Sequence, residues 1–148
     1  MTIDARRAPT GAPTYAATFV LGIEGAVTSD DYRVAVRRLQ RALRPGDQVI
    51  PMDTRTLGVH CVSLSSARET EALATRLAGI VRAPMAFGGE PRTLGVCVGA
   101  ATVQPDEPLA ATLHRAAESM RRMRDARAGL LGADVPPQRS GRSVALPR

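Results

Sequence analysis

The chain has 148 residues and a formal net charge of +6, and all 20 of its basic residues are arginine. This length fits one domain that buries a core without disulfides or metal, and no apolar run is long enough for a membrane span. With no Trp, two Tyr and two Phe, the chain lacks the stacking surfaces that bind single-stranded nucleic acid. We attribute the arginines to solvated helix faces and tails, and we expect no nucleic-acid and no membrane partner.

The N-terminal segment, residues 1–13, is rich in Ala, Arg, Pro and Gly without periodicity, which predicts a disordered tail. It has no hydrophobic segment of the kind found in secretory signals. Cys61 and Cys97 each fall inside an apolar run, as small core residues of a reducing compartment do, and a disulfide is the less favoured alternative. We therefore expect a cytoplasmic protein.

The first half of the chain reads as strand, helix and hairpin. A near-continuous apolar run over Tyr15–Ile23 predicts a central strand. Ser29 is the expected N-cap of a helix that ends at Arg44, before Pro45 and Gly46. Two short apolar runs, 49–52 and 57–64, predict a β-hairpin whose tip is residues 53–56.

The second half adds a helix, a strand and a helix. Ser66 and Glu69 have the spacing of a capping box, and Pro84 ends the helix that follows. Residues 93–103 form another apolar run and a second central strand. Pro108 marks the start of the last helix, which is expected to stop at Gly129 before a disordered tail over residues 130–148.

This element order predicts an α+β fold with a ferredoxin-like, split βαβ sheet of the kind found in nucleotide-cyclase palms. Its helices would pack mainly on one face, with the C-terminal helix added, over one domain at residues 14–129. The first strand would then lie between the hairpin and the 93–103 strand. Cys61 and Cys97 would flank that strand, too far apart to form a disulfide.

Four segments resemble the GGDEF domain of diguanylate cyclases. VLGIE at 20–24 is similar to the family's Asp-Ile-Asp strand end, and LRPGDQV at 43–49 to its Leu-Arg-Pro-x-Asp-x-Val approach to the catalytic hairpin. GVCVGAA at 95–101 resembles a Ser-Ile-Gly-Val-Ala strand, and LHRAAESMRRMR at 113–124 resembles the family's last helix. The order and spacing of these segments carry the resemblance over residues 15–129.

The catalytic residues that the resemblance implies are missing. The Gly-Gly-Asp-Glu-Phe signature falls on DTRTL at 53–57, so Arg55 replaces a metal-binding acid, and the other metal carboxylate falls on Gly22. The link to the first helix is too short for the family's guanine-binding residues, and only Arg124 keeps the charge of a phosphate-contacting Lys. Phosphoryl transfer depends on metal ions and positioning. We therefore expect no catalytic residues, metal, cofactor or cyclase activity.

A second site of the family is retained in outline. Many GGDEF domains bind their product, cyclic di-GMP, at an Arg-x-x-Asp motif five residues before the signature. Arg44 and Asp47 have that spacing, and Arg76 occupies the position of a further arginine on the next helix. Arginines can fork onto phosphate oxygens or guanine, and a carboxylate can accept from guanine N–H groups.

Each of these three residues also has a structural interpretation. Arg-Pro-Gly-Asp is a helix stop in its own right, Asp47 can simply close the turn, and Arg76 can be a solvated helix residue. The sequence thus leaves two main hypotheses: a catalytically inactive receptor for cyclic di-GMP, or a ligand-free scaffold that forms homodimers or binds a protein effector. An enzyme with altered nucleotide chemistry is the third and least favoured.

Overall fold

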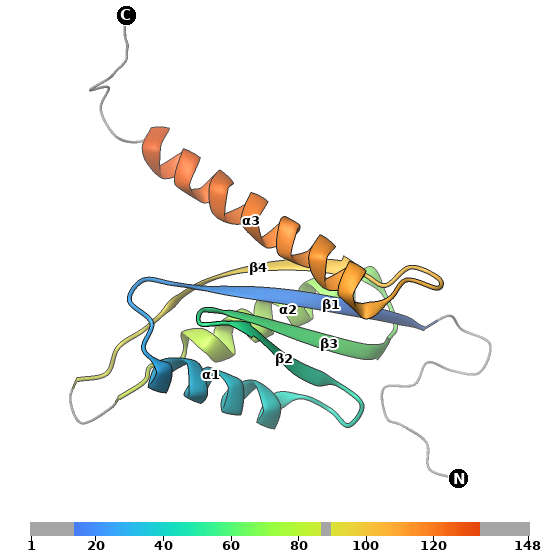
Figure 1. Ribbon diagram of the computed structural model, residues 1–148, viewed down its shortest axis with the longest axis horizontal. Coiled ribbons are helices and arrows are strands. Elements are labelled where there is room, and N and C mark those ends of the chain that lie inside the picture. The colour runs from blue at the N-terminus through green and yellow to red at the C-terminus, as the bar shows by residue number, and fades with distance from the viewer. Residues whose placement is uncertain (1–13, 87–89, 134–148) are drawn as a thin grey trace, which may run out of the picture.

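The computed structural model describes residues 14–86 and 90–133 (Figure 1). The expected tail at residues 1–13 and most of the expected tail at 130–148 lie outside these ranges. Seven elements follow one another in the predicted order: β1 (Tyr15–Glu24), α1 (Ser29–Ala42), β2 (Gln48–Asp53), β3 (Thr56–Leu64), α2 (Ala67–Arg82), β4 (Gly95–Thr102) and α3 (Leu109–Ala133).

The four strands form one sheet in the order β2-β3-β1-β4, and every neighbouring pair is antiparallel. It follows that β1 and β2, which α1 connects, run parallel but are separated by β3. This is the split βαβ arrangement, so the predicted fold class is confirmed. Cys61 pairs with Ala17 on one side of β1, and Cys97 pairs with Gly22 on the other. Both cysteines are buried and free, as expected.

Helices cover both faces of the sheet (Figure 1). The larger core lies on the face covered by α1 and α2, where Phe19, Leu21 and Leu57 meet Leu39 and other apolar helix side chains. A smaller core lies under α3 and joins Val20, Cys97 and Ala101 to Ala116, Ala117 and Met120. The predicted division, with two helices on one face and the C-terminal helix apart, is therefore confirmed.

Three helix boundaries differ from the sequence-based expectation. The N-cap of α1 is Thr28, one residue before Ser29, because Asp31 completes a capping box: Asp31 N–H donates to Thr28 Oγ1 and Thr28 N–H to Asp31 Oδ2. The helix ends at Ala42 rather than Arg44, since Leu43 is already extended. The last helix does not stop at Gly129, which lacks the left-handed backbone of a C-cap, and it continues to Ala133.

The N-cap of α2 is Ser66, whose hydroxyl accepts from Glu69 N–H at 3.2 Å. The reciprocal half of the predicted capping box is displaced by one residue. Glu69 Oε1 accepts from the backbone N–H and the hydroxyl of Ser65, at 2.6 and 2.9 Å, instead of from Ser66 N–H. The Glu69 side chain is therefore held by the end of β3.

An ion pair braces the turn between β4 and α3. Arg115 donates to both carboxylate oxygens of Glu107, at 2.6 and 2.8 Å, and to the carbonyl oxygen of Thr102 at 2.7 Å. The hydrogen bonds from Arg115 and from the backbone of Gln104 lower the pKa of Glu107 from 4.5 to about 2. This contact fastens the start of α3 to the end of the strand on which the helix packs.

A depressed pKa in the folded state means that the stabilisation by Glu107 is complete above pH 4.5 and is lost as the pH falls toward about 2. We expect Arg115→Met to lower the free energy of unfolding at pH 6 and to differ less from wild type at pH 2. Urea denaturation of the two proteins between these pH values measures the difference. A gap that stays constant down to pH 2 would contradict this role for the ion pair.

Candidate functional site

The turn between α1 and β2 is built from Arg44, Pro45, Gly46 and Asp47. Gly46 has φ +94°, a backbone conformation that favours glycine. Asp47 N–H donates to the Arg44 carbonyl oxygen at 3.0 Å, and Arg44 N–H donates back to Asp47 Oδ2 at 3.3 Å. The other carboxylate oxygen, Oδ1, accepts from Val62 N–H on β3 at 3.1 Å. Asp47 thus closes the turn and ties it to the sheet.

Arg76 approaches the same turn from α2. Its Nη2 donates to the Ala42 carbonyl oxygen at 3.3 Å, where α1 ends. The last carbonyl groups of a helix have no partner within the helix and carry a partial negative charge, so a guanidinium is well placed there. The guanidinium is solvent-exposed, which leaves its remaining N–H groups able to meet a ligand.

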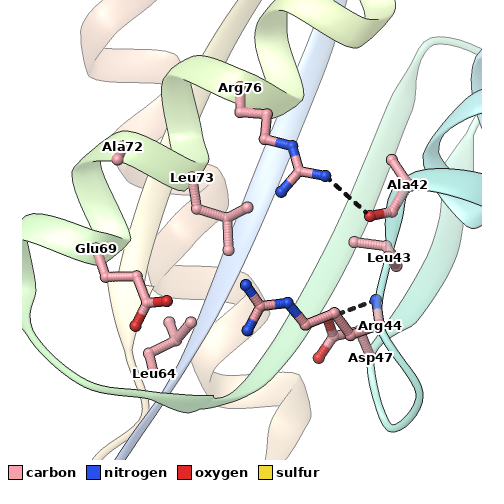
Figure 2. Close-up of a pocket in the computed structure, with 9 residues that line it drawn as sticks. All are labelled: Ala42, Leu43, Arg44, Asp47, Leu64, Glu69, Ala72, Leu73 and Arg76. Atoms are coloured by element: carbon pink, nitrogen blue, oxygen red, sulfur yellow. Dashed lines mark hydrogen bonds between the residues drawn. The ribbon is translucent and has the colours of Figure 1, made fainter. Parts of the chain in front are cut away.

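The three predicted site residues line one pocket of about 200 Å³ between α1, the turn and α2 (Figure 2). The two arginines come from different elements and extend into the same space. Apolar side chains of Leu43, Leu64 and Leu73 form much of the wall, together with Ala42 and Ala72. A ligand here would meet two planar cations beside an aliphatic surface.

Glu69 also lines this pocket, although its place in the sequence indicated only a capping role. Its spacing from Arg76 is about two helical turns, and Leu73 falls between them, so all three lie on one face of α2. That spacing was the signal that could have identified it. The pocket therefore has two arginines and two carboxylates, from Asp47 and Glu69.

The hairpin tip has the geometry of an ordinary turn. Thr54 and Arg55 connect β2 to β3, and Asp53 Oδ1 accepts from Arg55 N–H at 2.9 Å. This hydrogen bond lowers the pKa of Asp53 below its usual value. The Arg55 carbonyl oxygen accepts from Ile23 N–H at 2.8 Å and so joins the tip to the end of β1.

Close to the tip, a hollow of about 500 Å³ lies between the hairpin and the start of α1. Its walls include Tyr32 and Met52, and the Tyr32 hydroxyl donates to the Thr56 carbonyl oxygen at 3.0 Å. Burial raises the pKa of Tyr32. No pattern in the sequence indicated this hollow.

The end of β1 is covered by α3. A Cβ atom at Gly22 would lie 2.7 Å from Met120 Sδ, so a side chain there requires Met120 to move. Two positions later, Glu24 forms an ion pair with Arg127 at 2.8 Å and accepts from the Cys97 thiol at 3.2 Å. Burial and Glu24 raise the pKa of Cys97, and the positive charges of Arg127 and Arg124 oppose that shift.

Within residues 14–86 and 90–133, no three His, Cys, Asp or Glu side chains are grouped in a way that could hold a metal ion. In the same ranges, none of the helices combines the length and apolar character that crossing a membrane requires. The segment between Met85 and Arg92, after α2, lies partly outside the described ranges. Met85 and Arg92 on its two sides pair through backbone hydrogen bonds of 2.7 and 2.8 Å.

No protein-family model matches the sequence, and no curated protein matches it either. Solved structures with a similar fold include a sensory box/GGDEF family protein from Caulobacter crescentus, with a TM-score of 0.66, 20% identity, and coverage of 76% of this chain and 80% of that one. The GGDEF domain of Caulobacter crescentus DgcB, in complex with c-di-GMP, has a TM-score of 0.59 at 18% identity. The match covers 76% of this chain and 74% of that one.

The diguanylate cyclase SiaD of Pseudomonas aeruginosa, in complex with its activator SiaC, gives a TM-score of 0.63 at 15% identity. The match covers 76% of this chain and 47% of SiaD. Several independently determined GGDEF domains thus share the arrangement of strands and helices described above. In its fold, this chain is a GGDEF-like domain.

Proposed function

We propose that this chain is a catalytically inactive GGDEF-like domain that binds cyclic di-GMP at the pocket lined by Arg44, Asp47 and Arg76 and acts in signal transduction. The observation that carries the proposal is the meeting of Arg44, from the turn after α1, with Arg76, from α2, at one pocket. The pair provides two exposed guanidinium groups for an anionic ligand that is held against an aliphatic wall.

The chemistry of the pocket suits a nucleotide better than a bare anion. Each guanidinium can donate two parallel hydrogen bonds to phosphate oxygens or stack on the face of a base. The leucine side chains give a base an apolar surface, and the carboxylates give its N–H groups acceptors. At about 200 Å³ the pocket is smaller than typical ligand cavities of about 300–1,000 Å³, so it would enclose part of the dinucleotide and leave the rest in solvent.

The proposed inactivity rests on the residues at the old catalytic positions. Arg55 places a positive charge at the hairpin tip, where a divalent cation would be repelled. Gly22 offers no carboxylate, and Met120 occupies the space in front of it. Glu24, which remains, is neutralised by Arg127. An enzyme that must hold Mg²⁺ and a triphosphate needs the opposite arrangement of charges.

Isothermal titration calorimetry with cyclic di-GMP tests the receptor half of the proposal. We expect wild type to release or absorb heat on binding and Arg44→Ala to bind at least about tenfold more weakly, because a charge-assisted hydrogen bond is lost. Arg41→Ala is the matched control, since Arg41 is exposed near the end of α1 and does not line the pocket. Absence of binding by wild type would refute the receptor.

The proposed lack of cyclase activity is tested separately with radiolabelled GTP and Mg²⁺ or Mn²⁺. We expect no dinucleotide product from wild type. Formation of cyclic di-GMP or of a linear dinucleotide would show that the metal argument is wrong, whatever the calorimetry gives.

A specific feature of α3 favours the scaffold as the second candidate function. The residues that the structure describes at 121–129 are all exposed, and Met123 is 57% exposed on this projecting half of the helix (Figure 1). Exposed apolar side chains of this size are frequent at protein interfaces. A protein partner bound there would leave the nucleotide pocket untouched, and the calorimetric result separates the two functions.

A further inference from the structure

One edge of the sheet is formed by β4, which pairs only with β1 in the strand order β2-β3-β1-β4. Just past the end of β4, Val103 N–H donates to the Ala16 carbonyl oxygen at 2.9 Å, in the same register as the β1–β4 pairing. In an antiparallel pair, alternate residues exchange hydrogen bonds with the neighbouring strand. The odd-numbered residues of β4 therefore bond to β1, and the backbone groups of its even-numbered residues, such as Val98 and Ala100, point outward.

Two arginines meet this outward row of backbone groups. Arg82 Nη2 donates to the Val96 carbonyl oxygen at 3.0 Å, and Arg115 Nη2 donates to the Thr102 carbonyl oxygen at 2.7 Å. Both acceptors are even-numbered, as the alternation requires. No strand within the described ranges pairs with the outward side of the stretch between them, residues 98–100. The two arginines thus mark the ends of a short open edge.

A groove of about 330 Å³ lies beside β4, between α2 and α3. On the α2 side its wall has the short side chains of Ala74, Thr75 and Ala78. On the α3 side the wall includes Met123, an exposed apolar side chain. The two helices cover opposite faces of the sheet (Figure 1). An extended chain in this groove would meet backbone groups of β4 and side chains of both helices, as an added strand does.

The groove carries positive charge. Arg82 lines it from α2 and Arg127 lines it from α3, and none of the described residues in its lining is acidic. Glu24 pairs with Arg127 at 2.8 Å, whereas Arg82 is exposed. An arginine has five N–H donors, so Arg82 can keep its bond to β4 while it meets an acid. Successive side chains of an extended chain point to opposite faces, so two neighbouring acids would face the two helices.

We propose that the open edge of β4 binds an acidic, extended peptide segment of a partner protein as a fifth strand. A peptide backbone alternates N–H donors and carbonyl acceptors, as the outward groups of Val98 and Ala100 do. The phosphates of a nucleic acid offer only acceptors and would leave the outward carbonyl groups without donors. A second copy of this chain would bring its own Arg82 toward this one across the new pair of strands, and like charges repel.

Amide hydrogen exchange of ¹⁵N-labelled protein with the blocked peptide Thr-Val-Asp-Glu-Val-Thr tests this proposal. We expect 1 mM peptide to slow exchange of the outward amides of Val98 and Ala100 by about fivefold to tenfold, which corresponds to a Kd of about 0.1–0.2 mM. The amides of Cys97 and Gly99 already bond to β1 and should change little. The peptide Thr-Val-Lys-Lys-Val-Thr should bind about tenfold more weakly, because both acids become cations.

Two variants test the charge at the groove. Arg82→Gln should weaken binding of the acidic peptide by about threefold, as expected for an exposed ion pair. Arg68→Gln removes an exposed arginine from the same helix outside the groove and should bind as wild type does. Circular dichroism checks that both variants are folded. Equal affinity of Arg82→Gln and wild type, or of the lysine peptide and the acidic one, would overturn the acidic partner.

Three other outcomes overturn the added strand. The first is unchanged exchange at Val98 and Ala100 at millimolar acidic peptide. The second is slow exchange of both amides in the free protein that speeds up on dilution, which would show that a second copy covers the edge. The third is equal protection by an oligothymidylate, which would identify a nucleic-acid site. Failure of cyclic di-GMP to bind would refute the proposed function and leave this inference standing.

Discussion

Gly99→Ala is expected to destabilise the protein by about 3 kcal/mol or more, the upper end of the range for overpacked cores. A Cβ atom at Gly99 would lie 2.1 Å from the backbone nitrogen of Met120 and 2.3 Å from the Ala116 carbonyl oxygen. These are backbone atoms of α3, so no rotamer change relieves the overlap and the helix must move off the sheet. Thermal unfolding should show a loss of about 10 °C in Tm.

Gly79→Ala is the matched control for that substitution. Gly79 is an exposed residue of α2, and a Cβ atom there would meet no atom within 4 Å other than those of its own stretch of helix. Alanine is the better helix former, so Gly79→Ala should stabilise the protein by about 0.5–1 kcal/mol. If Gly99→Ala unfolds at the wild-type temperature, α3 does not pack directly on β4 at this position.

The largest effect on ligand binding is expected for Arg76. Arg76→Ala should weaken cyclic di-GMP binding by about a hundredfold, because a bidentate, charge-assisted contact disappears. Arg76→Lys should recover only part of the affinity, since an ammonium group keeps the charge but cannot form the planar fork. Titration calorimetry of the two variants beside wild type measures both effects.

The folded structure should tolerate both changes. Arg76 is exposed, and the hydrogen bond from its Nη2 to the Ala42 carbonyl oxygen is long at 3.3 Å. Arg68→Ala removes an arginine from the same helix outside the pocket and should bind as wild type does. Equal affinity of Arg76→Lys and wild type would mean that only the positive charge at this position contributes to binding. Equal affinity of Arg76→Ala would remove Arg76 from the site.

Much of the fold could be predicted because several local signals agree. Continuous apolar runs marked the central strands, Pro45 and Gly46 marked a helix stop, and the polar residues 53–56 marked the hairpin tip. The order of elements then restricted the topology to one that keeps crossovers short. Helix ends were harder, because Thr28 and Ser29 are both good N-cap residues and only the contact with Asp31 decides between them.

The last helix shows that a glycine in the sequence does not reliably mark the end of a helix. Gly129 lowers helix stability but does not end a helix unless its backbone turns left-handed, and that depends on the residues around it. Nothing in the local sequence distinguishes the two outcomes. The close approach of α3 at Gly99 is a similar case, because only the packed structure shows that the neighbour of this glycine is helix backbone.

For the candidate site, the sequence predicted Arg44, Asp47 and Arg76 from a resemblance, and the structure brings all three to one pocket. The sequence could not show which role Asp47 has in the turn. Asp47 as turn closure and Asp47 as ligand acceptor require the same residue at the same position. Only the hydrogen bonds from Val62 and Arg44 favour the first, and only the face of α2 brings Glu69 into the pocket.

We propose that cyclic di-GMP binds between α1 and α2 and not at the hairpin tip. Titration of ¹⁵N-labelled protein with cyclic di-GMP, followed by backbone amide shifts, tests it most directly. We predict saturable shifts of the amide signals of Arg44, Asp47, Leu64 and Arg76. The amide signal of Thr54 at the tip should not shift. Shifts centred on the tip, or no shifts at millimolar ligand, would contradict the claim.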